Sequence, residues 1–128
     1  MSGTAAASAA RRRIDQQELD AICARHDRLW QAKPGGARAV FAWLDLSGLS
    51  LAGRNLADAD FAAACLIGTD LSGAKLDNAT FFGADMQDCF LVDASLRRAD
   101  LRGACLRGAD LTGAITAGAR GLEIDTAA

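Results

Sequence analysis

Residues 84–103 read ADMQD CFLVD ASLRR ADLRG, and they show the unit from which most of the chain is built. In each five, the first residue is small, the third is large and apolar, and the fifth is polar or glycine. The apolar position recurs without exception between residues 39 and 113. A fixed period of this kind identifies an internal repeat. Its central residues are Phe41, Leu46, Leu51, Leu56, Phe61, Leu66, Leu71, Leu76, Phe81, Met86, Leu91, Leu96, Leu101, Leu106 and Leu111.

A period of five fits neither a strand, in which one face returns every two residues, nor a helix, in which it returns every 3.6. It fits a chain that bends every five residues and points one side chain inward from each straight segment. Ala is frequent two residues before the central residue, where an inward corner has room only for a methyl group. Gly is frequent two residues after it, where a bend needs unusual backbone dihedrals. The repeat therefore predicts an all-β solenoid with the central residues as its core.

This unit resembles that of the pentapeptide repeat family, in which Ala, then Asp or Asn, then Leu or Phe precede two variable residues. The resemblance implies a right-handed quadrilateral β-helix, in which four pentapeptides form one square coil and residues twenty apart stack. Residues 39–116 would then make about four coils. In this register Phe41, Phe61 and Phe81 fall in one column, so we expect their rings to stack.

Residues 14–36, which precede the repeat, carry the signature of a helix and a turn. Asp15 and Glu18 form a capping box, which predicts a helix from about Gln16 to Gln31. One amphipathic helix cannot bury its apolar face alone, and the end of a solenoid exposes strand edges, so we expect this helix to cap the first coil. The residues expected on its buried face are Leu19, Ile22, His26, Leu29 and Trp30.

The first coil departs from the repeat where this helix would lie. Leu44, Leu49 and Arg54 replace the small corner residue. The two leucines are long enough to reach the helix, whereas an inward arginine is unfavourable, so the geometry around Arg54 stays open. Residues 1–13 are expected to be a disordered tail.

Beyond Gly113 the repeat decays, and residues 117–128 are expected to form a C-terminal tail. Two interpretations of this end are possible. Leu122 and Ile124 cover it, or it stays open and pairs with a second copy of the chain to give a homodimer.

Length and composition limit the possible classes of protein. A chain of 128 residues has room for one domain. A net charge of -2 and a pI near 5.2 argue against direct binding to nucleic acid. The sequence has no apolar run of membrane-spanning length and no secretion signal, so no membrane association and a cytoplasmic location are expected. Cys65 and Cys105 share a column about 10 Å apart, beyond disulfide reach, which favours reduced thiols.

Residues that carry chemistry are sparse. The only histidine, His26, forms a Cys-x-x-His pair with Cys23, but a metal site needs three or four ligands and no second cluster lies near in sequence. The glycines follow the repeat and not a nucleotide-binding pattern. We therefore expect no catalytic site, no cofactor and no metal, and interpret the protein as a non-enzyme.

The remaining candidate for function is the outer surface. Residues next to the central ones point outward, and most are small or polar. Larger apolar ones indicate either a partner surface or scattered exposed hydrophobes. Between Asp45 and Asp93 the sequence has eight aspartates and only two basic residues, Arg54 and Lys75. A basic band of arginines follows this acidic middle. The candidate partner surface consists of Ile67, Phe82, Phe90, Val92, Arg97, Arg98, Arg102 and Arg107.

Two hypotheses of function follow. The first is a protein-binding or scaffold module, similar to repeat segments attached to regulatory domains in bacteria. The second comes from the resemblance, because some members of the family mimic duplex DNA and bind DNA gyrase. The acidic middle favours the second. The small net charge and the basic band oppose it, because a DNA mimic should carry carboxylates at phosphate-like spacing along most of its length.

Overall fold

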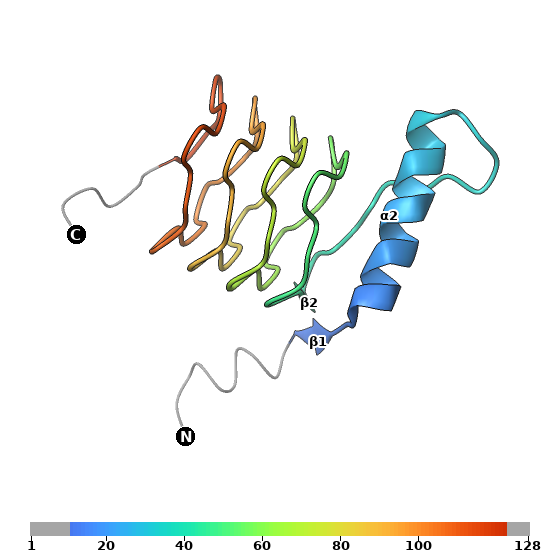
Figure 1. Cartoon of the computed structure of the whole chain (residues 1–128), viewed down its shortest axis with the longest axis horizontal. Coiled ribbons are helices and arrows are strands. Elements are labelled where there is room, and N and C mark those ends of the chain that lie inside the picture. Colours follow the sequence, from blue (N-terminus) through green and yellow to red (C-terminus); the bar gives the residue numbers. More distant parts are fainter. Residues whose placement is uncertain (1–10, 123–128) are drawn as a thin grey trace.

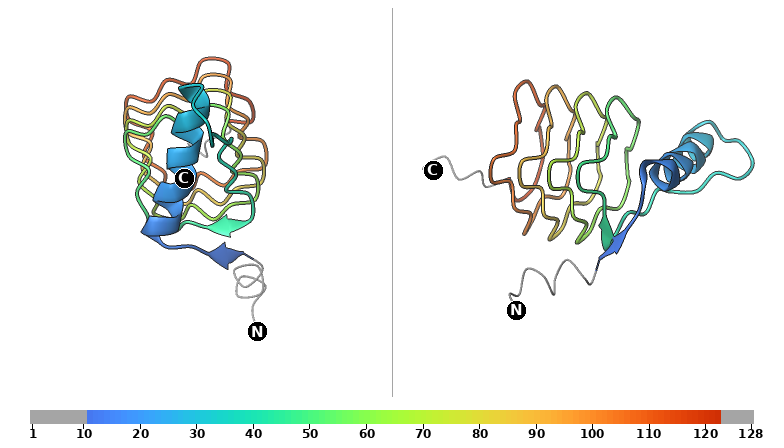
Figure 2. Two further views of the ribbon diagram at one scale, coloured as in Figure 1. Left: turned by 90° about the vertical axis from the view of Figure 1, so that its right-hand side faces the viewer. Right: turned by 60° about the horizontal axis from the view of Figure 1, so that its bottom comes forward.

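The repeat forms a stack of similar coils, with a single helix at one end (Figure 1). The computed structural model describes residues 11–122, with the element order β1 (Arg12–Arg13), α2 (Gln16–Trp30) and β2 (Leu44–Asp45). A view along the stack shows α2 crossing the open mouth of the first coil (Figure 2). Within residues 11–122, no helix is long and apolar enough to cross a membrane.

The coils are held in a twenty-residue register. Parallel bridges join residues twenty apart, from Val40 with Asp60 to Asp100 with Arg120. We therefore divide the stack into four coils, residues 40–59, 60–79, 80–99 and 100–119. Each coil has four sides, which are numbered in chain order and contain one central residue each. The register corrects the expected decay after residue 113, because it continues to Arg120. The first side holds Phe41, Phe61, Phe81 and Leu101; the second Leu46, Leu66, Met86 and Leu106; the third Leu51, Leu71, Leu91 and Leu111; the fourth Leu56, Leu76, Leu96 and Thr116.

Each bend is a tight turn with one residue in the left-handed region. The N–H of Leu44, for example, donates to the carbonyl of Phe41 at 3.1 Å, and the residue before it, Trp43, has φ 62. The same position has a positive φ in every unit as far as Gly118. Glycine adopts this conformation without strain, as type II turns require, whereas a bulky residue such as Trp43 is unusual there.

The core is a set of stacked columns. Every central residue from Phe41 to Leu106 is buried, whereas Leu111 is only partly buried at the far end. The rings of Phe41 and Phe61 have centroids 4.8 Å apart and are inclined by 14°. Those of Phe61 and Phe81 are also 4.8 Å apart and inclined by 5°, so the predicted aromatic column is confirmed. Each buried central residue stabilises the stack by about 1.5–3 kcal/mol before entropy is counted.

The start of the described chain is ordered, which corrects the expected tail at residues 11–13. β1 pairs in parallel with β2, and the N–H of Arg12 donates to the carbonyl of Trp43 at 3.3 Å. The Arg11 guanidinium reaches the second coil and donates to the carbonyl of Ala63 at 2.8 Å. These polar residues have no apolar pattern, so sequence gives no sign of the strand. Residues 1–10 lie outside the described part.

Side chains of α2 satisfy the backbone of the first coil on two other sides. The Gln16 amide donates to the carbonyl of Ser50 and accepts from its N–H, both at 2.9 Å, so it replaces the pairing that a preceding coil would give. Nδ1 of His26 accepts from the N–H of Ala39 at 2.9 Å. The indole of Trp30 approaches the other ring nitrogen at 3.1 Å. A neutral imidazole accepts at one nitrogen only, so only one of these two N–H groups can be bound at a time.

Arg54 points toward α2 and not into the core, which resolves the doubt about the first coil. Its Nη2 lies 2.6 Å from Oδ1 of Asp20, and both side chains keep contact with solvent. Leu44 and Leu49, at the two preceding bends of the same coil, are partly buried and pack against the core.

α2 begins as predicted and ends one residue early, with Gln31 as its C-cap. The Asp15 carboxylate accepts from the N–H of Glu18 at 2.8 Å, but Glu18 pairs with Arg12 instead of closing the capping box. The expectation that Leu29 and Trp30 are buried is wrong, because both are about half exposed. The helix buries Leu19, Cys23 and His26, and the chain reverses direction directly after Trp30.

Candidate interaction surface

The register decides which candidate surface residues lie together. Ile67 lies on the second side in the second coil, Phe90 and Val92 lie on the third side in the third coil, and Phe82 lies on the first side. The first three are therefore divided by a corner of the stack, and Val92 is only partly exposed. They do not form one continuous apolar surface.

The first side carries the three most exposed large hydrophobic residues of the described chain. Trp43 is 60% exposed, Phe82 55% and Val40 50%. Sequence reasoning missed Trp43, because it considered only the residues next to each central one, and it did not single out Val40, which precedes its central residue as Phe90 does. The sequence feature that could have revealed Trp43 is the presence of a tryptophan at a bend, where most units have Gly, Asp or Asn.

Phe82 is held in place by a charged neighbour in the next coil. The Arg102 guanidinium carbon lies 5.8 Å from the ring centroid of Phe82, a cation–π distance. Arg102 also donates from Nε and Nη2 to Asp100 at 2.9 and 2.8 Å. The side-chain hydrogen bond from Arg102 lowers the pKa of Asp100 to about 2. Arg102 therefore contacts both the Asp100 carboxylate and the Phe82 ring.

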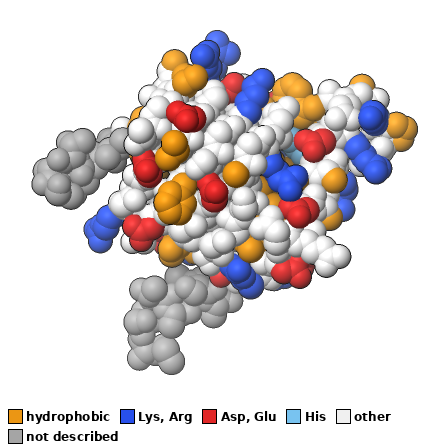
Figure 3. Space-filling view, in the orientation of Figure 1, with side chains coloured by type: hydrophobic (Ala, Val, Ile, Leu, Met, Phe, Trp, Pro, Cys, Tyr) orange, Lys and Arg blue, Asp and Glu red, His pale blue; other side chains and the backbone are white. Residues whose placement is uncertain are grey.

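The basic band does not form one patch. Arg97 and Arg98 lie on the fourth side, Arg102 on the first and Arg107 on the second. In the space-filling view, charges of both signs are mixed with hydrophobic side chains (Figure 3).

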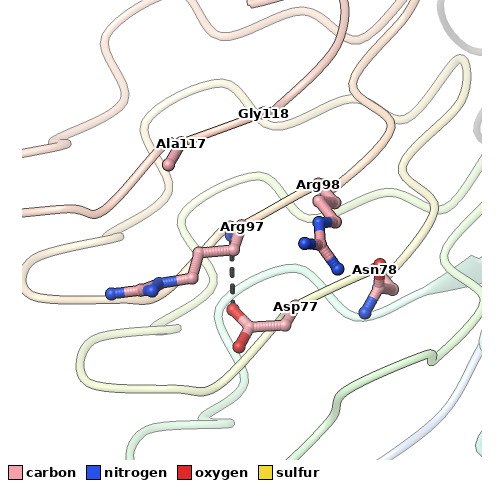
Figure 4. A pocket seen from close by; sticks show the side chains of 6 residues that line it. All are labelled: Asp77, Asn78, Arg97, Arg98, Ala117 and Gly118. Atoms are coloured by element: carbon pink, nitrogen blue, oxygen red, sulfur yellow. Dashed lines mark hydrogen bonds between the residues drawn. The ribbon is translucent and has the colours of Figure 1, made fainter.

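A shallow groove of about 420 Å³ lies on the fourth side. In Figure 4 the Arg97 guanidinium extends away from Asp77, and Arg98 lies beside Asn78. The Asp77 carboxylate accepts from the N–H of Arg97 at 3.2 Å and from the hydroxyl of Ser95. Because this carboxylate lies between the arginines, the groove is poorly suited to an anion. Its lining consists of Asp77, Asn78, Arg97, Arg98, Ala117 and Gly118.

The histidine and the four cysteines all lie in the described part of the chain. No group of three or more potential metal ligands occurs in the part that the structure describes. Burial raises the pKa of the Cys23 thiol to about 11, so this neighbour of His26 is not a thiolate at neutral pH. All four cysteines are free thiols. Three fill buried slots as expected, whereas Cys105 is exposed.

Comparison with known proteins identifies the repeat. The family model of pentapeptide repeats matches residues 37–73 and 74–113 with eight copies. Among curated proteins, no significant match is found. The chain is similar to the solved structure of alr5209, a pentapeptide repeat protein from Nostoc Pcc 7120, at 33% identity and a TM-score of 0.61 over 71% of this chain and 72% of that one.

Two further structures are similar to shorter parts of the chain. Rfr23, a pentapeptide repeat protein from the cyanobacterium Cyanothece 51142, is 31% identical over 64% of this chain and 59% of that one, with a TM-score of 0.46. QnrB1, a plasmid-mediated fluoroquinolone resistance protein, is 18% identical over 66% and 54%, with a TM-score of 0.37. Neither likeness carries a functional argument. The family match and the twenty-residue register together show that the chain belongs to the pentapeptide repeat family, whose fold is the right-handed quadrilateral β-helix and whose members are generally non-enzymatic.

Proposed function

We propose that this chain is a non-catalytic protein-binding module that presents the first side of a rigid β-helix to a partner protein. The observation that carries the proposal is the concentration of Trp43, Phe82 and Val40 on that one side. Aromatic residues are enriched at the centres of protein interfaces because they bury a large area at low entropic cost.

The backbone supports a rigid presentation of this surface. Consecutive coils are joined on all four sides by hydrogen bonds, such as Phe61 N–H to the Thr80 carbonyl at 2.8 Å and Phe81 N–H to the Asp100 carbonyl at 2.6 Å. A preorganised surface loses little conformational entropy on binding. The free thiols also favour a reducing compartment such as the cytoplasm.

We infer that α2 and β1 act as the cap of the first coil. Support comes from the contacts described above, in which β1 and the Gln16 amide give β2 and Ser50 the hydrogen bonds that a preceding coil would supply, and His26 accepts from the N–H of Ala39. The far end has no comparable helix in the described chain, and Leu111 is only partly buried there. We therefore keep this end as the place where a second copy would pair in a homodimer.

The alternative, a gyrase-binding DNA mimic, is less well supported. The register spreads the acidic middle over the whole circumference, so no side carries a continuous acidic strip that resembles a row of phosphates. By side, the aspartates are Asp60 on the first, Asp45, Asp85 and Asp88 on the second, Asp70 and Asp93 on the third, and Asp58 and Asp77 on the fourth.

Affinity capture from a bacterial lysate, read by mass spectrometry, tests the proposal. The double variant Trp43→Ala, Phe82→Ala is expected to lose a protein that the unchanged chain retains. Both alanines should be tolerated, because Ala63 and Ala62 occupy the same two positions one coil below Trp43 and one coil above Phe82. Phe90→Ala is the matched control, since Phe90 is similarly exposed on another side. Capture that survives the double variant refutes the proposed surface, and retention of gyrase subunits by every variant supports DNA mimicry.

A further inference from the structure

We propose that the first side binds a proline-rich segment in the polyproline II conformation, with two prolines three residues apart stacked on Trp43 and Phe82. This inference rests on the proposed function and names the chemistry of the partner. Proline-rich segments dock on exposed aromatic side chains, and their stiff backbone loses little entropy when it is bound.

The spacing of the coils that carry the two rings matches this ligand. Trp43 belongs to the first coil and Phe82 to the third, at neighbouring positions of the same side. Two steps of about 4.8 Å between paired strands separate them by roughly 9–10 Å along the stack. A polyproline II helix rises about 3.1 Å per residue, so prolines three apart on one edge are about 9.3 Å apart. One edge of such a helix therefore reaches both rings when it lies along the stack.

The residues between the rings are small, and the Arg11 side chain lies at their Ala63 edge. Ala62 and Ala63 occupy the second coil between the levels of Trp43 and Phe82, and Gly83 lies below Ala63. A methyl group placed on Gly83 would meet open space. These small residues leave both aromatic side chains standing above the surface, with Phe82 backed by Arg102.

The charges of this side favour a basic residue between the prolines. The Asp60 carboxylate accepts from the N–H of Ala62 at 2.9 Å and has no ion pair with any described residue. Asp100 is already paired with Arg102. Arg11 binds the Ala63 carbonyl at the opposite edge from Asp60, so it would repel a cation there. A lysine that follows two prolines would therefore be directed toward Asp60.

The test uses a synthetic peptide of Pro-Pro-Lys repeats added to the full chain labelled with ¹⁵N. Saturable shifts are expected at residues 40–43, 60–63 and 80–83. Trp43→Ala and Phe82→Ala should each weaken binding at least about tenfold. Asp60→Asn should weaken it severalfold and reduce its dependence on salt. Phe90→Ala should leave the affinity unchanged.

Control peptides separate this ligand from simple charge attraction. Ala-Ala-Lys repeats keep the charge and lose the stiff proline edge, and Pro-Pro-Glu repeats reverse the charge, so both should bind at least about tenfold more weakly. The inference is overturned by the absence of saturable shifts at millimolar peptide, by equal binding of Ala-Ala-Lys repeats, or by shifts on another side. If the Trp43 and Phe82 variants still abolish protein capture in that case, the proposed function stands and only the proline-rich ligand is rejected.

Discussion

The two ends of the stack differ in how their backbone is completed. At the first coil, β1 and the Gln16 amide replace the hydrogen bonds of a preceding coil, His26 accepts from the N–H of Ala39, and Arg54 is paired with Asp20 on α2. At the fourth coil, side chains of the repeat become progressively more exposed along the chain, as Leu106 is 7% exposed and Leu111 lies beyond the buried core. The repeat thus builds its own interior, whereas the first coil is completed by segments of other sequence.

The largest expected effect compares two leucines of the same column. Leu91→Asp places an unpaired charge inside the third coil and should destabilise the fold by roughly 4 kcal/mol or more, or prevent folding. Leu111→Asp, one coil further, is expected to cost only about 1–2 kcal/mol because water reaches the side chain. Urea unfolding followed by circular dichroism measures both. Equal losses would mean that the far end is as closed as the interior.

Removal of residues 1–36 should have the next largest effect. The truncated chain exposes Phe41, Leu46 and the upper strand edges of the first coil, so it is expected to aggregate or associate. Size-exclusion chromatography with light scattering measures its state. A stable monomer would show that α2 is not a cap, and would favour α2 itself as the partner-binding element.

A finer test replaces one side chain of the cap. Gln16→Ala removes both hydrogen bonds to Ser50 and should lower the free energy of unfolding by about 1 kcal/mol, since water partly replaces them. Gln17→Ala, at the next and exposed position, is the control and should change little. Hydrogen exchange at the Ser50 amide should accelerate only in the first variant. Unchanged exchange there would argue against the amide as a substitute for a coil.

The smallest expected effect concerns the ion pair of the last coil. Because Arg102 lowers the pKa of Asp100 from 3.8 to about 2, the carboxylate is stabilised in the folded state. The contribution of this carboxylate to the free energy of unfolding is present above about pH 4 and is lost as the pH falls through 2. A carbon-detected NMR titration of Asp100 should give a midpoint near 2. In Arg102→Ala the midpoint should move up toward the ordinary value of 3.8, and an unmoved midpoint would assign the shift to another cause.

The features that follow from the five-residue repeat were predictable from the sequence, and those that depend on individual side-chain contacts were not. The core, the stacked rings of Phe41 and Phe61, and the start of α2 all repeat a pattern or carry a known cap. β1 was missed because Arg12 and Arg13 show no strand pattern. The partner of Arg54 was missed because Asp20 is distant in sequence and near only after α2 crosses the coil.

The candidate surface was predicted less well for a similar reason. Sequence reasoning gave the outward direction of Phe82, and it grouped Ile67 with Phe90 across the corner that divides their adjoining sides. Trp43 was missed because its position in the repeat is normally occupied by a small or polar residue that permits the bend. Which outward residues are neighbours depends on the register and on the size of every residue in the adjacent coils, and no single pentapeptide contains that information.

The twenty-residue register also governs how this chain tolerates insertions and deletions. Loss or gain of one pentapeptide keeps the core pattern and every bend intact, yet it moves all later residues round to the next side. Such a change between Trp43 and Phe82 would separate them by a corner without disturbing the fold, whereas a change of four pentapeptides would keep them on one side and alter only their distance. Five residues are thus the unit of the repeat, and twenty are the number that can be inserted or deleted while every later residue keeps its side of the stack.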